Sequence, residues 1–255
     1  MVDAGCAYPV HPLLLDCDVE EPNAGLFLRP DISERRDAGV MIPSIDLESC
    51  IYCVRFAEVC QYHAIAVVGE KVLVFPELCH GCGSCSLNCP TEAIDEVLHV
   101  IGTVERGWAG SVEFGQGTMN VGEPMAVPII RQLKQWVIPS DSAYIDPDRL
   151  RSAVSADLAP DCLQSASAVS GDRPIILDAP PGTACPVVET MRCTDFVLMV
   201  TEPTPFGLHD LRLAVEVARD ELGLPVGVVV NRDGVGDRGV DEYCAVEDIP
   251  ILMRI

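Results

Sequence analysis

The chain has 255 residues, with 39 acidic and 17 basic side chains and a formal charge of −22 at pH 7. This charge excludes nucleic acid and anionic membranes as favoured partners, because both are bound by clustered lysine and arginine. No apolar run approaches the roughly 20 residues that span a bilayer. Thirteen cysteines without a secretory signal peptide indicate a reducing compartment, so we expect a soluble, cytoplasmic protein.

The first element in chain order is a short buried strand at Leu13–Leu15, after residues typical of a helix end and a turn. It runs into Asp16-Cys17-Asp18. Carboxylates at the carboxyl end of a buried strand lie where open α/β sheets bind ligands. A polar loop to Asn23 and a variable stretch to Pro43 follow, and neither predicts a regular element.

Residues 47–98 contain a duplicated cysteine motif. The segment Cys79–Pro90 has the spacing C-x2-C-x2-C-x3-C-P of bacterial ferredoxins, in which three thiolates surround one cluster and the fourth serves its neighbour. Five positions of an earlier copy match the later one at a constant offset of 29: Cys50, Cys53, Cys60, Ala64 and Ile65 match Cys79, Cys82, Cys89, Ala93 and Ile94. A constant offset indicates an internal duplication.

The crossed arrangement of a ferredoxin predicts two unequal sites. One site has four thiolates, from Cys60, Cys79, Cys82 and Cys85. The other has three, from Cys50, Cys53 and Cys89. Phe56 stands where Cys85 stands in the later copy, and its ring would fill much of the space a cubane needs. The three-thiolate site is thus open to a 3Fe–4S cluster, a 4Fe–4S cluster with a non-cysteine ligand, or no cluster. A structural zinc site or disulfides are the alternatives for the seven cysteines. The third thiolate and the C-P ending favour iron–sulfur over zinc, and disulfides would need an oxidising compartment.

The rest of the chain alternates strands and helices. The segments Ala64–Val68 and Lys71–Phe75 form a hairpin, as in the βαββαβ layout of a ferredoxin domain. Further strands are predicted at 97–105, 111–114, 174–178, 196–201, 226–230 and 249–253, and helices at 123–137, 148–158, 208–222 and near 242. The pattern predicts an α/β fold, with a mostly parallel sheet flanked by helices and an inserted α+β ferredoxin-like domain.

Four segments at strand ends resemble a known family: Leu13–Asn23 (LLLDCDVEEPN), Asp178–Val187 (DAPPGTACPV), Thr201–Asp210 (TEPTPFGLHD) and Val228–Arg232 (VVVNR). They resemble the MinD/ParA/Mrp superfamily of P-loop ATPases, and more narrowly the subgroup with an inserted ferredoxin domain. The resemblance implies that 1–46 and 99–255 form a P-loop NTPase-like α/β domain. The inserted iron–sulfur domain is then 47–98, and 138–172 is an insertion without an assigned role.

The resemblance also implies roles for five residues. Asp16 matches the acidic residue that helps to activate water, and Asp178 matches the Walker-B-type carboxylate that orders Mg²⁺. Asp18 lies in the same cofactor-binding segment, Gly182 lies in the turn that senses the γ-phosphate, and Asn231 matches the residue that contacts the adenine edge. The alternative is that these groups end well-packed strands, with carboxylates that accept backbone hydrogen bonds.

One departure from the family pattern is large. The sequence has no G-x4-G-K-[ST] loop and no lysine before Lys71, and such a loop holds the phosphates of Mg-ATP. Only 12 residues precede Leu13, whereas a βαβ unit needs roughly 30. We therefore expect the sheet to lack a central strand, in a chain truncated or misannotated at both ends. ATP and Mg²⁺, and the family's homodimer, would then require an upstream loop.

Two functions follow from these expectations. The first is an iron–sulfur protein of the ATPase family that couples, or once coupled, nucleotide state to electron transfer or cluster handling. The second is an electron-transfer or interaction module whose α/β body is a scaffold that binds no ATP. Both use at least one 4Fe–4S cluster and a redox or iron–sulfur assembly protein as partner. The acidic charge favours a partner with a basic surface. A zinc-stabilised structural protein is a third alternative, and it would be colourless.

Overall fold

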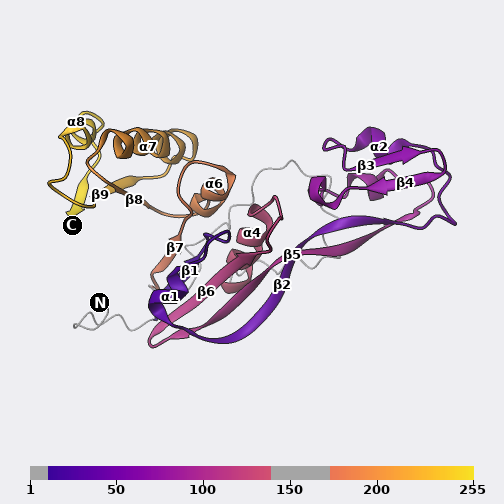
Figure 1. Ribbon diagram of the computed structural model, residues 1–255, viewed down its shortest axis with the longest axis horizontal. Coiled ribbons are helices and arrows are strands. Elements are labelled where there is room, and N and C mark those ends of the chain that lie inside the picture. Colours follow the sequence, from indigo (N-terminus) through magenta and orange to yellow (C-terminus); the bar gives the residue numbers. More distant parts are fainter. Residues whose placement is uncertain (1–10, 139–172) are drawn as a thin grey trace.

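The computed structural model describes residues 11–138 and 173–255. Figure 1 shows three parts: a central sheet with a helix against it, a small cysteine-bearing part at the end of a long ribbon, and a C-terminal lobe. The helix end expected before residue 11 and the helix expected at 148–158 lie outside the described residues. Within the described ranges, none of the helices has the length and apolarity needed to cross a membrane.

The central sheet has five strands in the order β2-β5-β6-β1-β7. Their bounds are Asp31–Ile45 for β2, Ile94–Ala109 for β5, Val112–Met119 for β6, Leu13–Asp16 for β1 and Ile175–Asp178 for β7. Strand β1 pairs parallel with both β6 and β7, whereas β5 pairs antiparallel with both β2 and β6. The predicted short strand at Leu13–Leu15 is therefore an inner strand of this sheet.

Helix α4, Val127–Val137, packs on one face of the sheet. Its Ile129 and Leu133 are fully buried in one core with Leu13 and Leu15 of β1. The helix begins four residues later than the sequence predicted. Its first turn contains a proline, which a first turn tolerates because the N–H groups there have no partner within the helix.

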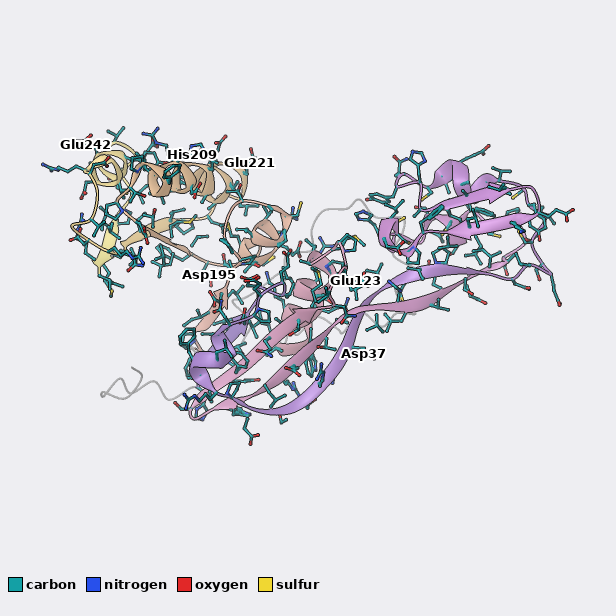
Figure 2. The ribbon with its side chains drawn as sticks, viewed as in Figure 1. Asp37, Glu123, Asp195, His209, Glu221 and Glu242 are labelled. Atoms are coloured by element: carbon teal, nitrogen blue, oxygen red, sulfur yellow. The ribbon has the colours of Figure 1, made fainter. Side chains whose placement is uncertain are left out.

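The ribbon formed by β2 and β5 was not predicted in full. Strand β2 is an edge strand, and its first half is polar and largely exposed, so it shows no apolar alternation. Pro43 lies within it, which an edge strand tolerates because one side of its backbone is unpaired. Figure 2 labels Asp37 on the ribbon and Glu123 near the point where the ribbon leaves the body. The Nε2 atom of His99 on β5 lies 3.7 Å from Oε1 of Glu123.

The small part at the end of the ribbon has the predicted ferredoxin-like elements. They are helix α2 at Arg55–Val59, strands β3 at Ile65–Val68 and β4 at Lys71–Val74, a 3-10 turn at Pro76–Leu78 and helix α3 at Ser84–Leu87. Strands β3 and β4 form the predicted antiparallel hairpin. The fully buried core of this part is small, and it consists of Phe56, Ile65 and Ile94.

The C-terminal lobe contains a separate, wholly parallel sheet in the order β10-β9-β8. Its elements, with the helix that leads into it, are α6 at Cys185–Met191, β8 at Val197–Thr201, α7 at Pro205–Val215, β9 at Val226–Val230, α8 at Gly239–Val246 and β10 at Ile251–Arg254. The predicted helix 208–222 ends as a π-helical turn at Glu216–Glu221. Strands β7 and β8 are edges of different sheets.

The loop that carries the later cysteine copy rests directly on the ribbon. Gly81 has a φ of +63°, a conformation that glycine adopts without a steric penalty. A Cβ atom at this position would lie 2.7 Å from Cγ1 of Val40 and 3.1 Å from the carbonyl oxygen of Met41. The contact with β2 therefore leaves no room for a side chain, and it fixes the loop against the body's own strand.

We predict that Gly81→Ala destabilises the protein more than Gly69→Ala does. Gly69 has the same φ of +63° but has open space around it, so its substitution costs only the backbone term of about 1–2 kcal/mol. Gly81→Ala adds overpacking against β2, which costs about 1–3 kcal/mol more. Urea unfolding of the two variants measures the difference. Equal losses would show that the loop does not pack on the ribbon as described.

Candidate iron–sulfur site

Four cysteine side chains line one pocket in the small part of the protein. They are Cys60, Cys79, Cys82 and Cys85. Cys60 follows α2 in the earlier copy, whereas the other three belong to the loop and helix of the later copy. The pocket wall is completed by residues from both strands of the ribbon, including Met41 of β2 and Glu96 of β5. The structure thus brings together the four residues that the duplication predicts as one ligand set.

The backbone repeats the duplication as clearly as the sequence does. At positions 29 apart, left-handed φ values recur at Tyr52 and Gly81, at Val54 and Gly83, and at His63 and Glu92. Glycine adopts a left-handed φ without strain, whereas a β-branched residue such as valine rarely adopts one. The earlier copy therefore keeps the backbone of a cysteine loop even where tyrosine and valine replace the glycines.

Two cysteines at matching positions make the same backbone contact. The N–H of Ala64 donates to Sγ of Cys60 at 3.3 Å, and the N–H of Ala93 donates to Sγ of Cys89 at 3.2 Å. Hydrogen bonds to sulfur stabilise a thiolate and help to set the potential of a cluster bound to it. Both sulfurs are therefore oriented by the turn that follows them.

Burial controls the protonation of the thiols in the pocket. It raises the pKa of Cys79 and of Cys85 above the ordinary value. For Cys89, burial also raises the pKa, but hydrogen bonds from the backbone N–H groups of Thr91 and Ala93 outweigh it, and the pKa is lowered. The thiols of Cys79 and Cys85 are therefore protonated near neutral pH, and a metal that binds them must displace protons.

The other predicted set, Cys50, Cys53 and Cys89, lies near a core that contains Phe56, and two of its members, Cys50 and Cys89, pack against that core. Phe56 is 1% exposed and packs with Ile65 and Ile94. Four cysteines drawn from both sets lie against this core: Cys50, Cys60, Cys85 and Cys89. The phenyl ring therefore occupies the interior next to the place where a fourth thiolate would stand, as the sequence suggested.

The donor set of the pocket is four cysteine thiols. Four thiolates are the ligands of a 4Fe–4S cluster, and they are also one ligand set of structural zinc. The C-x2-C-x2-C-x3-C-P pattern that supplies three of the four is the feature that favours a cluster.

The comparisons with known proteins agree with this donor set. Residues 72–95 match the family described as "4Fe-4S binding domain". The matched segment includes Cys79, Cys82, Cys85 and Cys89. Residues 72–95 of this chain are therefore similar to a 4Fe–4S binding domain.

Two curated relatives align with most of this chain. It is 28% identical over 225 residues to uncharacterized protein MJ0579 of Methanocaldococcus jannaschii, which covers 88% of this chain and 70% of that protein. It is also 28% identical over 204 residues to uncharacterized protein MJ0578 of the same organism, with 79% and 60% covered. Both alignments therefore extend over more than three quarters of this chain.

The similar solved structures include members of the superfamily that the strand-end motifs resemble. The septum site-determining protein MinD of Pyrococcus horikoshii, complexed with Mg-ADP, has a TM-score of 0.43 at 15% identity and covers 96% of this chain and 68% of that one. The cell division ATPase MinD of Pyrococcus furiosus has a TM-score of 0.38 at 17% identity, with 95% and 69% covered.

Three carboxylates matched to nucleotide positions, Asp16, Asp18 and Asp178, gather at one edge of the central sheet. Asp16 and Asp178 are register partners at the carboxyl ends of β1 and β7. Burial raises the pKa of both carboxyls; the charge of Asp178 adds to the effect on Asp16, and that of Asp18 adds to the effect on Asp178. Gly182 follows in the loop after β7, at a φ of +92°. Asn231 follows β9 in the other sheet, so strand pairing does not bring it to this group.

Asp16 also has a clear structural task. It is 1% exposed, and its Oδ2 accepts hydrogen bonds from the backbone N–H groups of Asn23 and Ala24, both at 2.9 Å. Its Oδ1 accepts the N–H of Asp18 at 3.2 Å. These bonds hold the loop after β1 and the start of helix α1, Ala24–Leu28. The arrangement is the alternative that the sequence left open, namely a strand-end carboxylate that accepts backbone hydrogen bonds.

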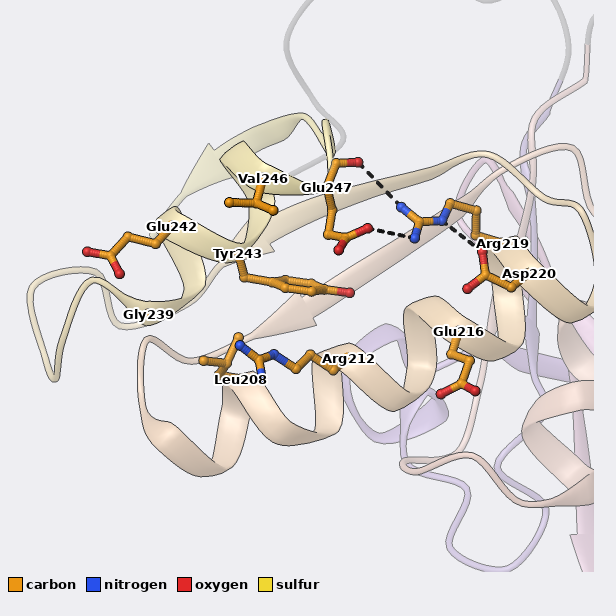
Figure 3. Close-up of a pocket in the computed structure, with 10 residues that line it drawn as sticks. All are labelled: Leu208, Arg212, Glu216, Arg219, Asp220, Gly239, Glu242, Tyr243, Val246 and Glu247. Atoms are coloured by element: carbon orange, nitrogen blue, oxygen red, sulfur yellow. Dashed lines mark hydrogen bonds and ion pairs between the residues drawn. The ribbon is translucent and has the colours of Figure 1, made fainter.

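An open pocket between α7 and α8 is a weaker candidate site (Figure 3). Its two arginines already have partners within the protein. Arg219 donates to Asp220 at 3.0 Å and to Glu247 at 2.8 Å, and the guanidinium of Arg212 lies 5.3 Å from the ring centre of Tyr243. Because these cations are engaged, the pocket offers an anionic ligand little free positive charge.

Contacts that sequence reasoning missed lie around the cysteine pocket. Tyr62 and His80 stack on each other at its wall, and Glu96 accepts a hydrogen bond from the hydroxyl of Ser86 at 2.9 Å. His80 and Ser86 occupy variable positions within the later cysteine motif, whereas Tyr62 and Glu96 lie outside it, and the contacts join segments that are apart in the chain. The position of Tyr62 two residues after Cys60 is the one signal that could have indicated its place.

We predict that Cys60→Ala abolishes the cluster as completely as Cys79→Ala, because both sulfurs belong to one set of four. Cys53→Ala, in the same copy as Cys60, should keep it. Iron and acid-labile sulfide per chain measure the outcome, with the buried Cys244→Ala as a control for cysteine loss elsewhere. A normal 4Fe–4S content in Cys60→Ala would show that the crossed ligand assignment is wrong.

We predict that Asp16→Asn destabilises the fold, whereas Asp178→Asn does so little. An asparagine amide nitrogen cannot accept a backbone N–H, and a buried donor left without its partner costs about 1–3 kcal/mol. Asp178 is largely exposed, so its substitution should change the free energy of unfolding by less than about 0.5 kcal/mol. Urea unfolding measures both. Wild-type stability in Asp16→Asn would remove the structural role and leave the catalytic one.

Proposed function

We propose that this protein holds one 4Fe–4S cluster and transfers single electrons, with its α/β body acting as a scaffold of the MinD/ParA type. The observation that supports this most directly is the pocket lined by four cysteines from two halves of a duplicated motif. The match of residues 72–95 to the 4Fe–4S binding domain agrees with it.

The residues of the pocket have distinct tasks in this function. A bound 4Fe–4S cluster supplies reversible one-electron redox chemistry, and the four cysteines of the complete set supply its thiolates. The N–H of Ala64 donates to Sγ of Cys60, which favours the more reduced state because it withdraws charge from sulfur. Met41 and Ile65 line the wall and limit the access of water. The carboxylate of Glu96 acts in the opposite sense, since nearby negative charge favours the oxidised state.

The number of clusters follows from Phe56. Its buried ring lies within the core that the cysteines of both sets contact, and it cannot ligate iron. A second cubane would have to displace this ring and would still have only three cysteines. We therefore assign the cluster to the complete set alone.

We predict four iron atoms and four sulfides per chain for the wild type, and a higher iron content for Phe56→Cys. The substitution supplies the missing thiol and removes the ring that blocks the second site. Phe56→Leu is the matched control, since it also shortens a buried side chain, at a cost of up to about 3–5 kcal/mol, but adds no ligand. An iron content near eight in the wild type would contradict the proposal.

A second candidate function is the coupling of nucleotide state to the cluster. One contact favours it: the side chain of Gln132 on α4 donates to the carbonyl of Gly39 at 2.7 Å and accepts the N–H of Gly39 at 3.2 Å. This pair of hydrogen bonds joins the body, which carries Asp16 and Asp178, to the ribbon that holds the cysteine loop. Coupling differs from simple electron transfer in one respect, because it requires Mg-ATP to shift the cluster's reduction potential.

A further inference from the structure

Two aromatic rings stand between the cysteine pocket and the solvent. The rings of Tyr62 and His80 are stacked, with centres 3.7 Å apart and planes inclined by 17°. Both residues line the pocket. His80 directly follows Cys79, and Tyr62 lies two residues after Cys60, so each ring is carried next to a cysteine of the complete set.

The stack is exposed on its outer side. Tyr62 is 44% exposed, and His80 is also exposed. Flat aromatic surfaces that are half in solvent are favoured as contact points in protein interfaces. The rings therefore offer a partner a rigid contact surface that reaches inward to the cluster pocket.

The charge around the stack restricts the kind of partner. Residues 47–98 carry seven acidic side chains and two basic ones. Glu58 and Glu77, which precede Tyr62 and His80 by four and three residues, are both exposed. A surface of this sign attracts a basic partner and raises its rate of association at low ionic strength.

We propose that the Tyr62–His80 stack is the contact through which the cluster passes electrons to a partner protein with a basic docking surface. The inference rests on the proposed function and adds to it the place of exchange and the chemistry of the partner. A reduced cluster held by the four cysteines would supply one electron, which a one-electron acceptor such as a ferric haem would gain. No covalent bond forms or breaks, and no proton is transferred.

The test uses the cluster-loaded full chain, reduced under anaerobic conditions, and ferric cytochrome c as a basic one-electron probe. Stopped-flow absorbance gives the second-order rate of haem reduction, and calorimetry gives the affinity for the probe. Tyr62→Ala and His80→Ala should each slow haem reduction by roughly tenfold or more, and should weaken binding. Iron content, reduction potential and the electron paramagnetic resonance signal should stay as in the wild type.

Two matched variants separate the stack from a general surface effect. Tyr62→Phe keeps the ring and should restore the wild-type rate. Ile51→Ala changes an exposed residue at the position that corresponds to His80 in the earlier copy, and it should leave the rate unchanged. The rate with wild type should also fall as salt is added.

The outcomes distinguish the two proposals. If the wild type reduces cytochrome c and the double variant Tyr62→Ala/His80→Ala does so equally fast, the stack is not the contact, and the function stands. A loss of rate explained wholly by a changed potential or iron content would also overturn the inference. If the wild type holds no cluster or transfers no electron, the proposed function fails as well.

Discussion

The structure of the iron–sulfur part depends on Cys60 crossing from the earlier copy of the motif into the pocket of the later copy. The hydrophobic core cluster described there is small and is built around Phe56, Ile65 and Ile94. So small a core provides little stabilisation by itself, and metal binding normally supplies the remainder in domains of this size. A cluster bound by thiolates of both copies would join α2 to the cysteine loop, so the same bonds that hold the cofactor would hold the fold.

The pocket is also continuous with the body. Strands β2 and β5 belong to the central sheet at one end and line the pocket at the other. Gly81 packs on Val40 of this ribbon. The preceding residue of the ribbon, Gly39, is hydrogen-bonded to the side chain of Gln132 on α4. The cluster site is therefore fixed in position relative to the sheet edge with the three carboxylates, rather than attached by a flexible linker.

Local patterns predicted much of this arrangement, and non-local pairings explain what they missed. The cysteine spacing and the constant offset predicted which sulfurs share a pocket, and buried apolar runs predicted β1, β7, β8 and β9. Strand β2 was missed because its polar, exposed first half depends on pairing with a segment more than 60 residues away. The Tyr62–His80 stack and the backbone partners of Asp16 have no motif, since they arise only when loops fold against each other.

We propose that the crossed set of four cysteines holds one 4Fe–4S cluster, and that Phe56 fills the space that a second cluster would need. The most direct measurement is the electron paramagnetic resonance spectrum of the fully reduced protein. Our account predicts a single 4Fe–4S signal that integrates to about one spin per chain, without broadening by a neighbouring cluster. Two magnetically coupled signals would contradict it, and so would a colourless protein that contains zinc.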